Sequence, residues 1–370
     1  MERLILAALD ALILLVTALL SWLMPSLTRQ RLLFGVTVPV GARGSPAGRG
    51  IITRYRAGVL GVALLAALGL AALYAFAADD FWASVLPGIL LLIAICAFSI
   101  PYLFAYAASR HLAAMLAPAA GDSVPAAAAA ETRPGGYGDY VPWVWEALPL
   151  AVIAATAGYL AAHYAAAPAR IATHFDAAGR ANGFADKSIF TYFALVWGQI
   201  ALEVVLLALA VLIAHARAIP GAAAARFRTL WLRYLYGLRL LVLALFGGSA
   251  IVVALSASGT PTGTEWILPA AVVLVVFVLG GAILLAVWTG QGGSRLGPVA
   301  ETGTDRSDDR FWKLGAIYVN PRDPSIFVER RFGIGWTINL GNPRGIALLA
   351  ALLAVPIGSI VLVTVLGAAR

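Results

Sequence analysis

The chain has 370 residues, of which 61% are hydrophobic and only 12% are charged, and this composition excludes an ordinary water-soluble domain. Its 26 Lys and Arg residues outnumber 18 Asp and Glu residues, and the loops of a membrane protein explain this excess without a nucleic-acid partner. One cysteine, Cys96, excludes a disulfide framework within the chain.

Eight apolar runs are long enough to cross a bilayer as helices, which takes about 20 residues each. In chain order they are Leu4–Met24, Ala57–Ala78, Val85–Ala107, Leu148–Ala167, Ser188–Ala214, Tyr234–Ala257, Trp266–Trp288 and Gly345–Gly367. The first run is too long for the apolar part of a signal peptide, and no small-residue cleavage pattern follows it. We therefore expect an all-α polytopic membrane protein of about eight transmembrane helices, with a small cytoplasmic strand-rich module before the last helix.

The runs divide the chain into five parts. These are 1–108, with three transmembrane helices and a basic loop at 25–56; 109–147, an Ala/Pro/Gly linker; 148–289, with four transmembrane helices and a loop at 168–187; 290–344, the strand-rich module; and 345–370, the last helix. The linker is expected to be flexible because its low-complexity stretch lacks large apolar side chains.

The distribution of basic residues predicts the orientation. The loops after the first, third, fifth and seventh runs hold 20 of the 26 Lys and Arg residues, whereas the opposite face holds 5. Because basic loops are retained in the cytoplasm, both termini are expected outside it. The basic cytoplasmic face also attracts anionic lipid headgroups, so that the lipid bilayer is the first expected partner.

Polar residues inside the runs are costly in lipid and mark candidate functional positions. Glu203 lies near the middle of the fifth run with Gln199 on the same face, and Arg239 lies inside the cytoplasmic end of the sixth. If the fifth and sixth helices are antiparallel neighbours, Arg239 lies close to Glu203. Three interpretations of Glu203 stay open: a buried ion pair, a proton- or ion-coupling carboxylate, and a carboxylate without a role. Asp10 and His163 lie at comparable depth near the outer face, where a pair is sterically feasible.

The outer loop 168–187 is rich in polar residues of several types. Its candidate ligand-binding residues are His174, Asp176, Gly179, Asn182 and Lys187. Three interpretations stay open: a turn at Asp176–Gly179 braced by His174, recognition of a peptide or other ligand, and a metal site. Zinc usually needs three or four protein ligands, so we assign no metal and no cofactor. The Asn182-Gly183 step predicts a second turn.

The segment after Asp308 alternates short β-branched and aromatic runs with Asn-Pro, Asp-Pro and Gly breaks, which is typical of strands and turns. It predicts strands at Ala316–Val319, Ile326–Arg330 and Trp336–Leu340. The candidate residues of this module are Trp312, Asn320, Glu329, Arg331, Trp336 and Asn339. Its aromatic residues are expected to form a core rather than a binding face, and Arg330 and Arg331 to be solvated, lipid-facing charges.

Three strings resemble known families. His174-Phe175-Asp176-x-x-Gly179, with Asn182-Gly183 and Lys187-Ser188, resembles a loop of an uncharacterised bacterial membrane domain, which also forms the N-terminal part of immunity proteins against the sporulation-delaying toxin. Segment Phe311–Pro343, with its Asn-Pro-x-Asp-Pro-Ser and Gly-Trp-Thr-x-Asn strings, is similar to a second uncharacterised domain. The string Phe34–Pro39 and the pair Tyr55-Arg56 fit the same multi-pass architecture.

The sequence departs from the pattern of these families at three points. Asp176 stands where Asn is common, Ala181 stands where Pro is common, and the signature half of the immunity proteins is not visible. The resemblance implies a multi-pass protein of the bacterial cell (inner) membrane and a link to peptide-toxin or envelope-stress biology, but no activity.

Enzyme motifs are missing from the sequence. There is no His-Glu-x-x-His, Gly-x-Ser-x-Gly, Walker A or Ser-x-x-Lys string, and Gly136-Tyr137-Gly138-Asp139 lacks the second aspartate that an intramembrane aspartyl protease needs. We expect a non-enzymatic protein of immunity, sensor or accessory type that recognises a peptide or envelope component through loop 168–187. Its inner Phe311–Asn342 module is expected to contact a cytoplasmic protein partner or lipid. A secondary transporter or ion-coupled permease using Glu203 is the alternative, and a membrane-embedded hydrolase comes third.

Overall fold

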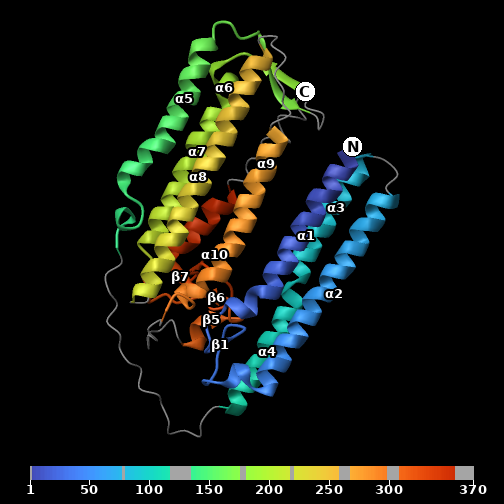
Figure 1. Cartoon of the computed structure of the whole chain (residues 1–370), viewed down its shortest axis with the longest axis vertical. Coiled ribbons are helices and arrows are strands. Elements are labelled where there is room, and N and C mark those ends of the chain that lie inside the picture. The colour runs from blue at the N-terminus through green and yellow to red at the C-terminus, as the bar shows by residue number, and fades with distance from the viewer. Residues whose placement is uncertain are drawn as a thin grey trace.

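A computed structural model describes residues 2–76, 80–116, 135–175, 181–216, 221–257, 267–297 and 308–354. These residues form an all-α polytopic membrane protein with seven helices long and apolar enough to cross a membrane, and with small two-stranded sheets. The helices form two bundles side by side, and most of the strands gather at one end of both (Figure 1).

The first bundle contains α1 (Glu2–Leu27), α2 (Pro46–Phe76), α3 (Asp80–Ala97) and α4 (Ser99–Leu116). Glycines let α2 approach its neighbours: a β-carbon on Gly58 would lie 2.8 Å from Pro101 of α4, and one on Gly69 would lie 2.8 Å from Leu90 of α3. Close backbone approach through small residues is a common way to pack helices in lipid, where no hydrophobic force draws them together.

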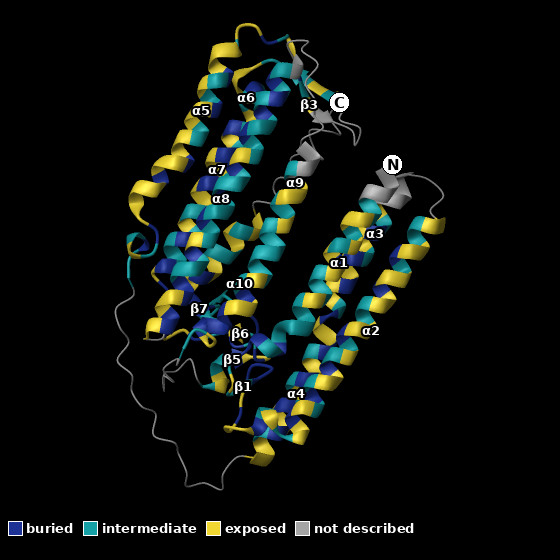
Figure 2. Ribbon diagram, in the orientation of Figure 1, coloured by how far each residue is buried: buried dark blue, intermediate teal, exposed yellow. Residues whose placement is uncertain are grey.

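The second bundle contains α5 (Ala147–His163), α6 (Ile189–Tyr192), α7 (Ala194–Ala214), α8 (Ala222–Ala257), α9 (Ile267–Val276), the π-helical turn η5 (Phe277–Gly281) and α10 (Ala282–Thr289). Tyr234 of α8 donates its hydroxyl to the carbonyls of Phe277 and Val278, at 3.0 and 2.6 Å, where the π-turn loosens the helix. Figure 2 shows exposed residues along the outer faces of α2 and α5 and buried residues between α7 and α8, as expected of helices surrounded by lipid.

One end of the second bundle carries the antiparallel hairpin of β3 (Arg170–Phe175) and β4 (Ala181–Asp186), and α1 begins at the same end of the molecule, which we call the hairpin end (Figure 1). Ile171 is 2% exposed and packs with Tyr192 of α6 and with Ala250 and Ala254 of α8. The hairpin is therefore seated on the helices rather than held away from them.

The opposite end, the module end, carries two further groups of strands. The module consists of β5 (Trp312–Lys313), β6 (Ile317–Tyr318), β7 (Phe327–Glu329) and β8 (Trp336–Ile338), while β1 (Leu32–Leu33) and β2 (Val36–Thr37) form a separate hairpin between α1 and α2. The backbone N–H of Leu340 donates to the carbonyl of Tyr318 at 2.9 Å and joins the two hairpins of the module. The predicted strands correspond to β6, β7 and β8, and β5 was not predicted.

The structure changes several expected boundaries. Seven predicted spans are present in the described residues, and the eighth begins as the helix Pro343–Ala354, with the rest outside those residues. α2 begins at Pro46 and α8 at Ala222, so both extend beyond their apolar runs into basic segments, because Arg and Ala favour helices wherever nothing opposes them. The expected linker 109–147 is ordered at both described ends: α4 continues to Leu116, and residues 135–147 pack onto the second bundle.

Candidate functional site

An ionic cluster of Tyr137, Glu146, Glu203 and Arg239 lies inside the second bundle. Arg239 of α8 is fully buried. Its Nε donates to Glu203 Oε2 at 3.2 Å, and its Nη2 donates to Glu203 Oε1 on α7. Its Nη1 donates to Glu146 Oε1 at 3.1 Å, and its Nη2 to Glu146 Oε2 at 2.5 Å. The second Nη1 donor reaches the Tyr137 hydroxyl oxygen at 3.1 Å, so all five guanidinium N–H groups have acceptors.

Two short helical turns bring Tyr137 and Glu146 to Arg239. Tyr137 opens η2 (Tyr137–Asp139), and Glu146 ends η3 (Trp143–Glu146) just before α5. The Tyr137 hydroxyl donates to Glu146 Oε1 at 2.5 Å. Burial, followed by this hydrogen bond, raises the pKa of Tyr137 above its usual value, so the phenol stays neutral and keeps its donor.

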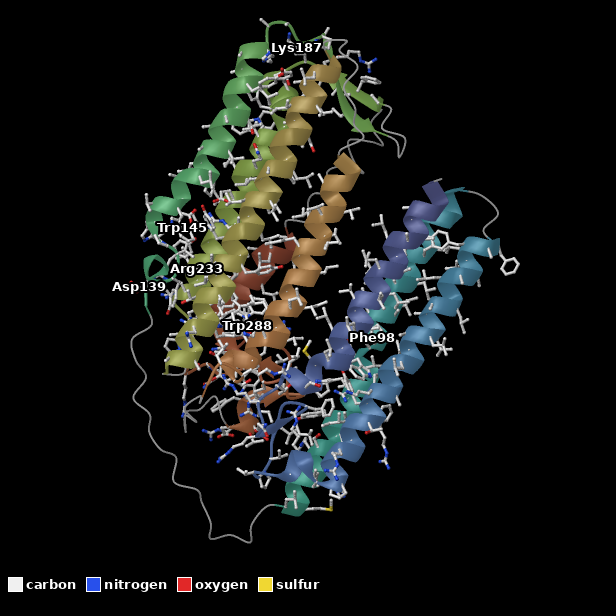
Figure 3. All side chains as sticks on the ribbon, viewed as in Figure 1. Phe98, Asp139, Trp145, Lys187, Arg233 and Trp288 are labelled. Atoms are coloured by element: carbon white, nitrogen blue, oxygen red, sulfur yellow. The ribbon has the colours of Figure 1, made fainter. Side chains whose placement is uncertain are left out.

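Aromatic and basic side chains lie next to the ionic cluster. The Arg233 guanidinium lies 5.7 Å from the Trp145 ring centroid, and its Nε donates to the Tyr140 carbonyl at 3.1 Å (Figure 3). The Tyr236 hydroxyl donates to the Trp145 carbonyl at 2.7 Å. These contacts hold the segment before α5 against α8.

The ionic cluster can fix the helices of the second bundle to one another. Two carboxylates and one guanidinium leave one net negative charge when all three are ionised. Paired and hydrogen-bonded in this way, the charges fix η3, α7 and α8 to one another, and removing one partner would leave a buried charge unsatisfied.

The contact predicted between Glu203 and Arg239 is confirmed, whereas the sequence analysis missed Glu146. That residue falls at the end of the expected linker, just before the fourth apolar run and at about the depth of Arg239. This shared depth was the available signal, because a buried Arg needs counter-charges near it. Gln199 takes a different partner: its Nε2 donates to the Leu243 carbonyl of α8 at 2.8 Å.

Asp10 and His163 are not brought together. Asp10 accepts a hydrogen bond from the Tyr74 hydroxyl at 2.7 Å within the first bundle. His163 lies in the second bundle, stacked on Tyr159 with ring centroids 4.2 Å apart, and its Nδ1 lies 2.8 Å from the Tyr159 carbonyl oxygen. Among the described residues, no group of three or more His, Cys, Asp or Glu side chains is arranged to hold a metal ion.

The hairpin places the candidate residues of loop 168–187 differently from the prediction. His174 lies in β3 opposite Gly183 of β4, so Asn182-Gly183 belongs to a strand and not to a turn. Asp176 and Gly179 lie outside the described residues, and the turn expected there stays a prediction. Lys187, at the base of the hairpin, donates to the Ala167 carbonyl at 2.7 Å and therefore helps to close the hairpin (Figure 3).

The hairpin also presents an exposed aromatic side chain. Phe184 of β4 is 40% exposed, and the Arg170 guanidinium lies 5.7 Å from its ring centroid. An aromatic ring beside a cation is a common element of binding surfaces, because it offers apolar area and charge together.

Inside the module, buried asparagines hold the loops together. Asn339 is fully buried, and its Nδ2 donates to the carbonyls of Asn320 and Asp323 at 2.9 and 3.0 Å. Its Oδ1 accepts from the backbone N–H groups of Asn320 and Gly341 at 3.0 and 2.9 Å. The Asn and Asp residues of the conspicuous strings are thus engaged within the module, and their role is to stabilise its turns.

The module contacts both bundles through its remaining candidate residues. Arg331 is 4% exposed, which contradicts the expected solvated charge: its guanidinium pairs with Asp309 and donates to the Gly35 carbonyl at 3.2 Å. Arg330 remains exposed. Glu329 pairs with Arg29. On the other side, Trp336 packs on Phe227 of α8 with ring centroids 5.7 Å apart.

The contact with the first bundle joins sequence segments that are far apart. Phe34 and Gly35 form the tight turn of the β1–β2 hairpin, with φ of 48° and 80°. Gly35 meets Gly315 of the module so closely that a β-carbon on Gly35 would overlap the Gly315 carbonyl oxygen. Phe332 packs between Phe34 and Tyr102, with ring centroids at 5.3 and 4.7 Å. The expected aromatic core is therefore divided: Trp312 is buried inside the module, while Phe332 and Trp336 form its contacts with the two bundles.

Two segments of the chain match known families. Residues 321–346 match a family of unknown function (DUF5808), and residues 151–198 match a domain of unknown function (DUF1648). The first segment contains β7, β8 and the start of the last helix, and the second runs from α5 through the hairpin into α7. The chain matches no curated protein and no solved structure. The matches agree with the resemblance to two uncharacterised domains and carry no activity.

Proposed function

We propose that this protein is a non-enzymatic membrane sensor of immunity or accessory type. In this proposal the β3–β4 hairpin faces the outside of the cell and recognises a peptide or an envelope component. The module faces the cytoplasm and passes the signal to a protein partner.

The main support for this proposal is helix α8, because it contacts the hairpin at one end of the molecule and the module at the other. It packs against Ile171 of β3 at the hairpin end and, through Phe227, against Trp336 of the module. Its 36 residues span about 54 Å at 1.5 Å per residue. The ionic cluster holds its middle to α7 and η3, so a displacement at the hairpin would reach the module as movement of a stiff element.

The distribution of charge supports the orientation. The basic segments 29–56, 226–233 and 308–344 lie at the module end, whereas the described hairpin end offers Arg3, Arg170 and Lys187 (Figure 1). Under the positive-inside rule the module end is cytoplasmic. The cell membrane of a bacterium, with the chain's termini outside, fits this arrangement.

A survival and cross-linking experiment tests the proposal. Cells lacking the protein are challenged with secreted peptides of neighbouring strains, with and without the wild-type chain or its Phe184→Ala variant. Phe190→Ala is the matched control, because Phe190 is an aromatic residue 80% exposed at the same end but outside the hairpin. We expect the wild type and the control to protect, Phe184→Ala to protect less, and a photoreactive residue at position 184 to cross-link to the active peptide. Equal survival with and without the protein for every peptide would contradict the proposal.

Proton-coupled transport is a second candidate, favoured by the excess negative charge of the buried ionic cluster. In this alternative Glu203 or Glu146 takes up a proton during transport. Vesicles containing the purified chain would then show a flux under a pH gradient, and Glu203→Gln would abolish it. Wild-type vesicles without flux under any imposed gradient would rule this candidate out.

A further inference from the structure

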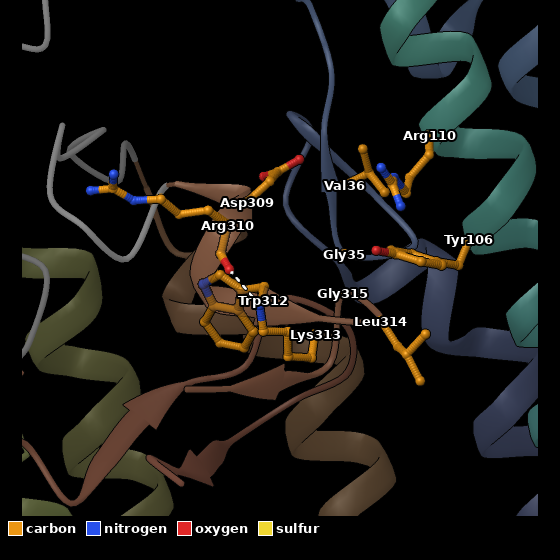
Figure 4. Close-up of a pocket in the computed structure, with 10 residues that line it drawn as sticks. All are labelled: Gly35, Val36, Tyr106, Arg110, Asp309, Arg310, Trp312, Lys313, Leu314 and Gly315. Atoms are coloured by element: carbon orange, nitrogen blue, oxygen red, sulfur yellow. Dashed lines mark hydrogen bonds between the residues drawn. The ribbon is translucent and has the colours of Figure 1, made fainter. Parts of the chain in front are cut away.

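A cavity of about 460 Å³ opens where the first bundle meets the module. Tyr106 and Arg110 of α4 form one wall with the Gly35–Val36 turn, and the segment from Asp309 to Gly315 forms the other (Figure 4). Ligand pockets in proteins hold roughly 300–1,000 Å³, so this space suits a small molecule or a lipid headgroup.

The walls of this cavity are firmly positioned. The Tyr102 hydroxyl donates to the Leu314 carbonyl at 2.7 Å, and its ring stacks with Tyr106 at 6.5 Å between centroids. Gly35 and Gly315 touch at the back of the space. The cavity therefore belongs to the docked arrangement of the module and would be lost if the module separated from α4.

The charge of the cavity is positive. Asp309 is neutralised by Arg331 and also accepts a bond from the Thr37 hydroxyl at 2.7 Å. Arg310 turns away and pairs with Asp308 at 2.8 Å. Among the residues that the structure describes, Arg110 and Lys313 have no carboxylate within 4.0 Å, and the Lys313 ammonium donates only to the Arg310 carbonyl at 3.2 Å.

We propose that this cavity binds a phosphate-bearing ligand between Arg110 and Lys313. An arginine on one wall and a lysine on the other suit a phosphoryl group, whose oxygens accept hydrogen bonds from Arg110 and, once the lysine ammonium leaves the Arg310 carbonyl, from Lys313. The Tyr106 phenol lines the same space and adds a further donor. The phosphoryl group belongs either to a phospholipid of the bilayer or to a soluble phosphate compound, and in both cases it would fasten α4 to the module. This inference does not depend on what the hairpin recognises.

Native mass spectrometry of the full chain in a neutral detergent tests the proposal. Phosphatidylglycerol and phosphatidylcholine with the same acyl chains are titrated in one arm, and inorganic phosphate and pyrophosphate in the other. The variants are Arg110→Gln, Lys313→Gln and their combination. Arg322→Gln is the matched control, since Arg322 is an exposed cation of the same module outside the cavity. Thermal unfolding of each unliganded variant confirms that it is folded.

The expected result is one high-affinity site. Each cation near an anionic phosphate contributes about 1 kcal/mol, so each single variant should bind roughly fivefold more weakly and the double variant roughly 25-fold, with the control unchanged. Selective binding of phosphatidylglycerol identifies a lipid headgroup, and selective binding of phosphate or pyrophosphate identifies a soluble ligand. No preference for any of these anions over phosphatidylcholine, or equal weakening by Arg322→Gln and the double variant, would overturn the proposal.

Discussion

The two helical bundles hold their helices together by different means. In the second bundle a fully buried Arg239 binds two carboxylates from η3 and α7. The first bundle uses single hydrogen bonds between its helices: the Tyr74 hydroxyl donates to Asp10, the Tyr55 hydroxyl donates to the Ser21 carbonyl, and Arg56 donates to the Trp22 carbonyl and the Ser26 hydroxyl. Apolar packing around Val59 and neighbouring residues accompanies them. The second bundle is therefore fixed by paired charges, whereas the first combines apolar packing, single hydrogen bonds and its contact with the module.

The module is where the two kinds of packing meet. It docks on the first bundle through Gly35, Phe34 and Phe332, and on the second through Trp336 and Phe227. Gln291, just after α10, adds a bond to the second side by donating from Nε2 to the Arg330 carbonyl at 3.0 Å. A change in either bundle therefore reaches the same small domain.

The largest expected effect comes from removing the central charge of the second bundle. Arg239→Met leaves two carboxylates buried without a counter-charge and should lower the free energy of unfolding by about 3–5 kcal/mol. Unfolding of the purified protein in detergent measures this loss. Adding Glu146→Gln and Glu203→Gln to the same protein should restore much of it, because no buried charge then remains.

Arg226→Met is the matched control for this substitution. Arg226 lies on the same helix and is exposed, so its loss should cost little. Equal destabilisation by Arg239→Met and Arg226→Met would show that the ionic cluster does not fix the second bundle.

The next largest effect is expected where the first bundle contacts the module. Gly35→Ala places a β-carbon against the Gly315 carbonyl and should destabilise the docked module by about 1–3 kcal/mol, as overpacking usually does. Gly41→Ala is the control, because Gly41 has a similar φ of 86° but no atom within 4 Å of the place that a β-carbon would take. Protease cleavage of the module should accelerate for Gly35→Ala alone, and identical cleavage of both variants would contradict the contact between Gly35 and Gly315.

The smallest effects compare the same substitution in the two bundles. Tyr137→Phe removes a buried hydrogen bond to a carboxylate and should cost about 1.5–3 kcal/mol, while Tyr74→Phe removes one that is only partly buried and should cost about 0.5–1.5 kcal/mol. The order of the two unfolding free energies, measured at neutral pH, checks the comparison. A larger loss of unfolding free energy for Tyr74→Phe than for Tyr137→Phe would contradict the comparison of the two bundles.

The pH dependence sharpens the test at Tyr137. Because its pKa is raised in the folded protein, the unfolded chain loses this proton first, near pH 10, and binds fewer protons than the folded chain above about that pH. The stability that Tyr137 contributes is therefore present at neutral pH and lost as the pH rises above about 10. The difference in unfolding free energy between the wild type and Tyr137→Phe should narrow over that pH range. A constant difference would contradict the raised pKa of Tyr137.

Apolar length predicted the helices well, and antiparallel packing of consecutive helices predicted the contact of Glu203 with Arg239. Two kinds of feature were not predicted from the sequence. Glu146 and Tyr137 lie in a Pro- and Gly-rich segment whose local composition favours a loop, and tertiary contacts with Arg239 and with the apolar cluster around Ala214 and Leu232 hold them against the bundle. Arg331 was expected in solvent because its acceptors, Asp309 and the Gly35 carbonyl, come from turns whose meeting depends on tertiary packing.

Labelling of single cysteines from the two sides of the membrane tests the central claim most directly. The background is Cys96→Ala, and the reporters are Ala181→Cys in the hairpin and Arg322→Cys in the module, both at exposed positions. A membrane-impermeant maleimide added to intact cells should label position 181 at once and position 322 only after the membrane is opened. Labelling of both positions from the same side would contradict a helix bundle that carries its hairpin outside and its module inside.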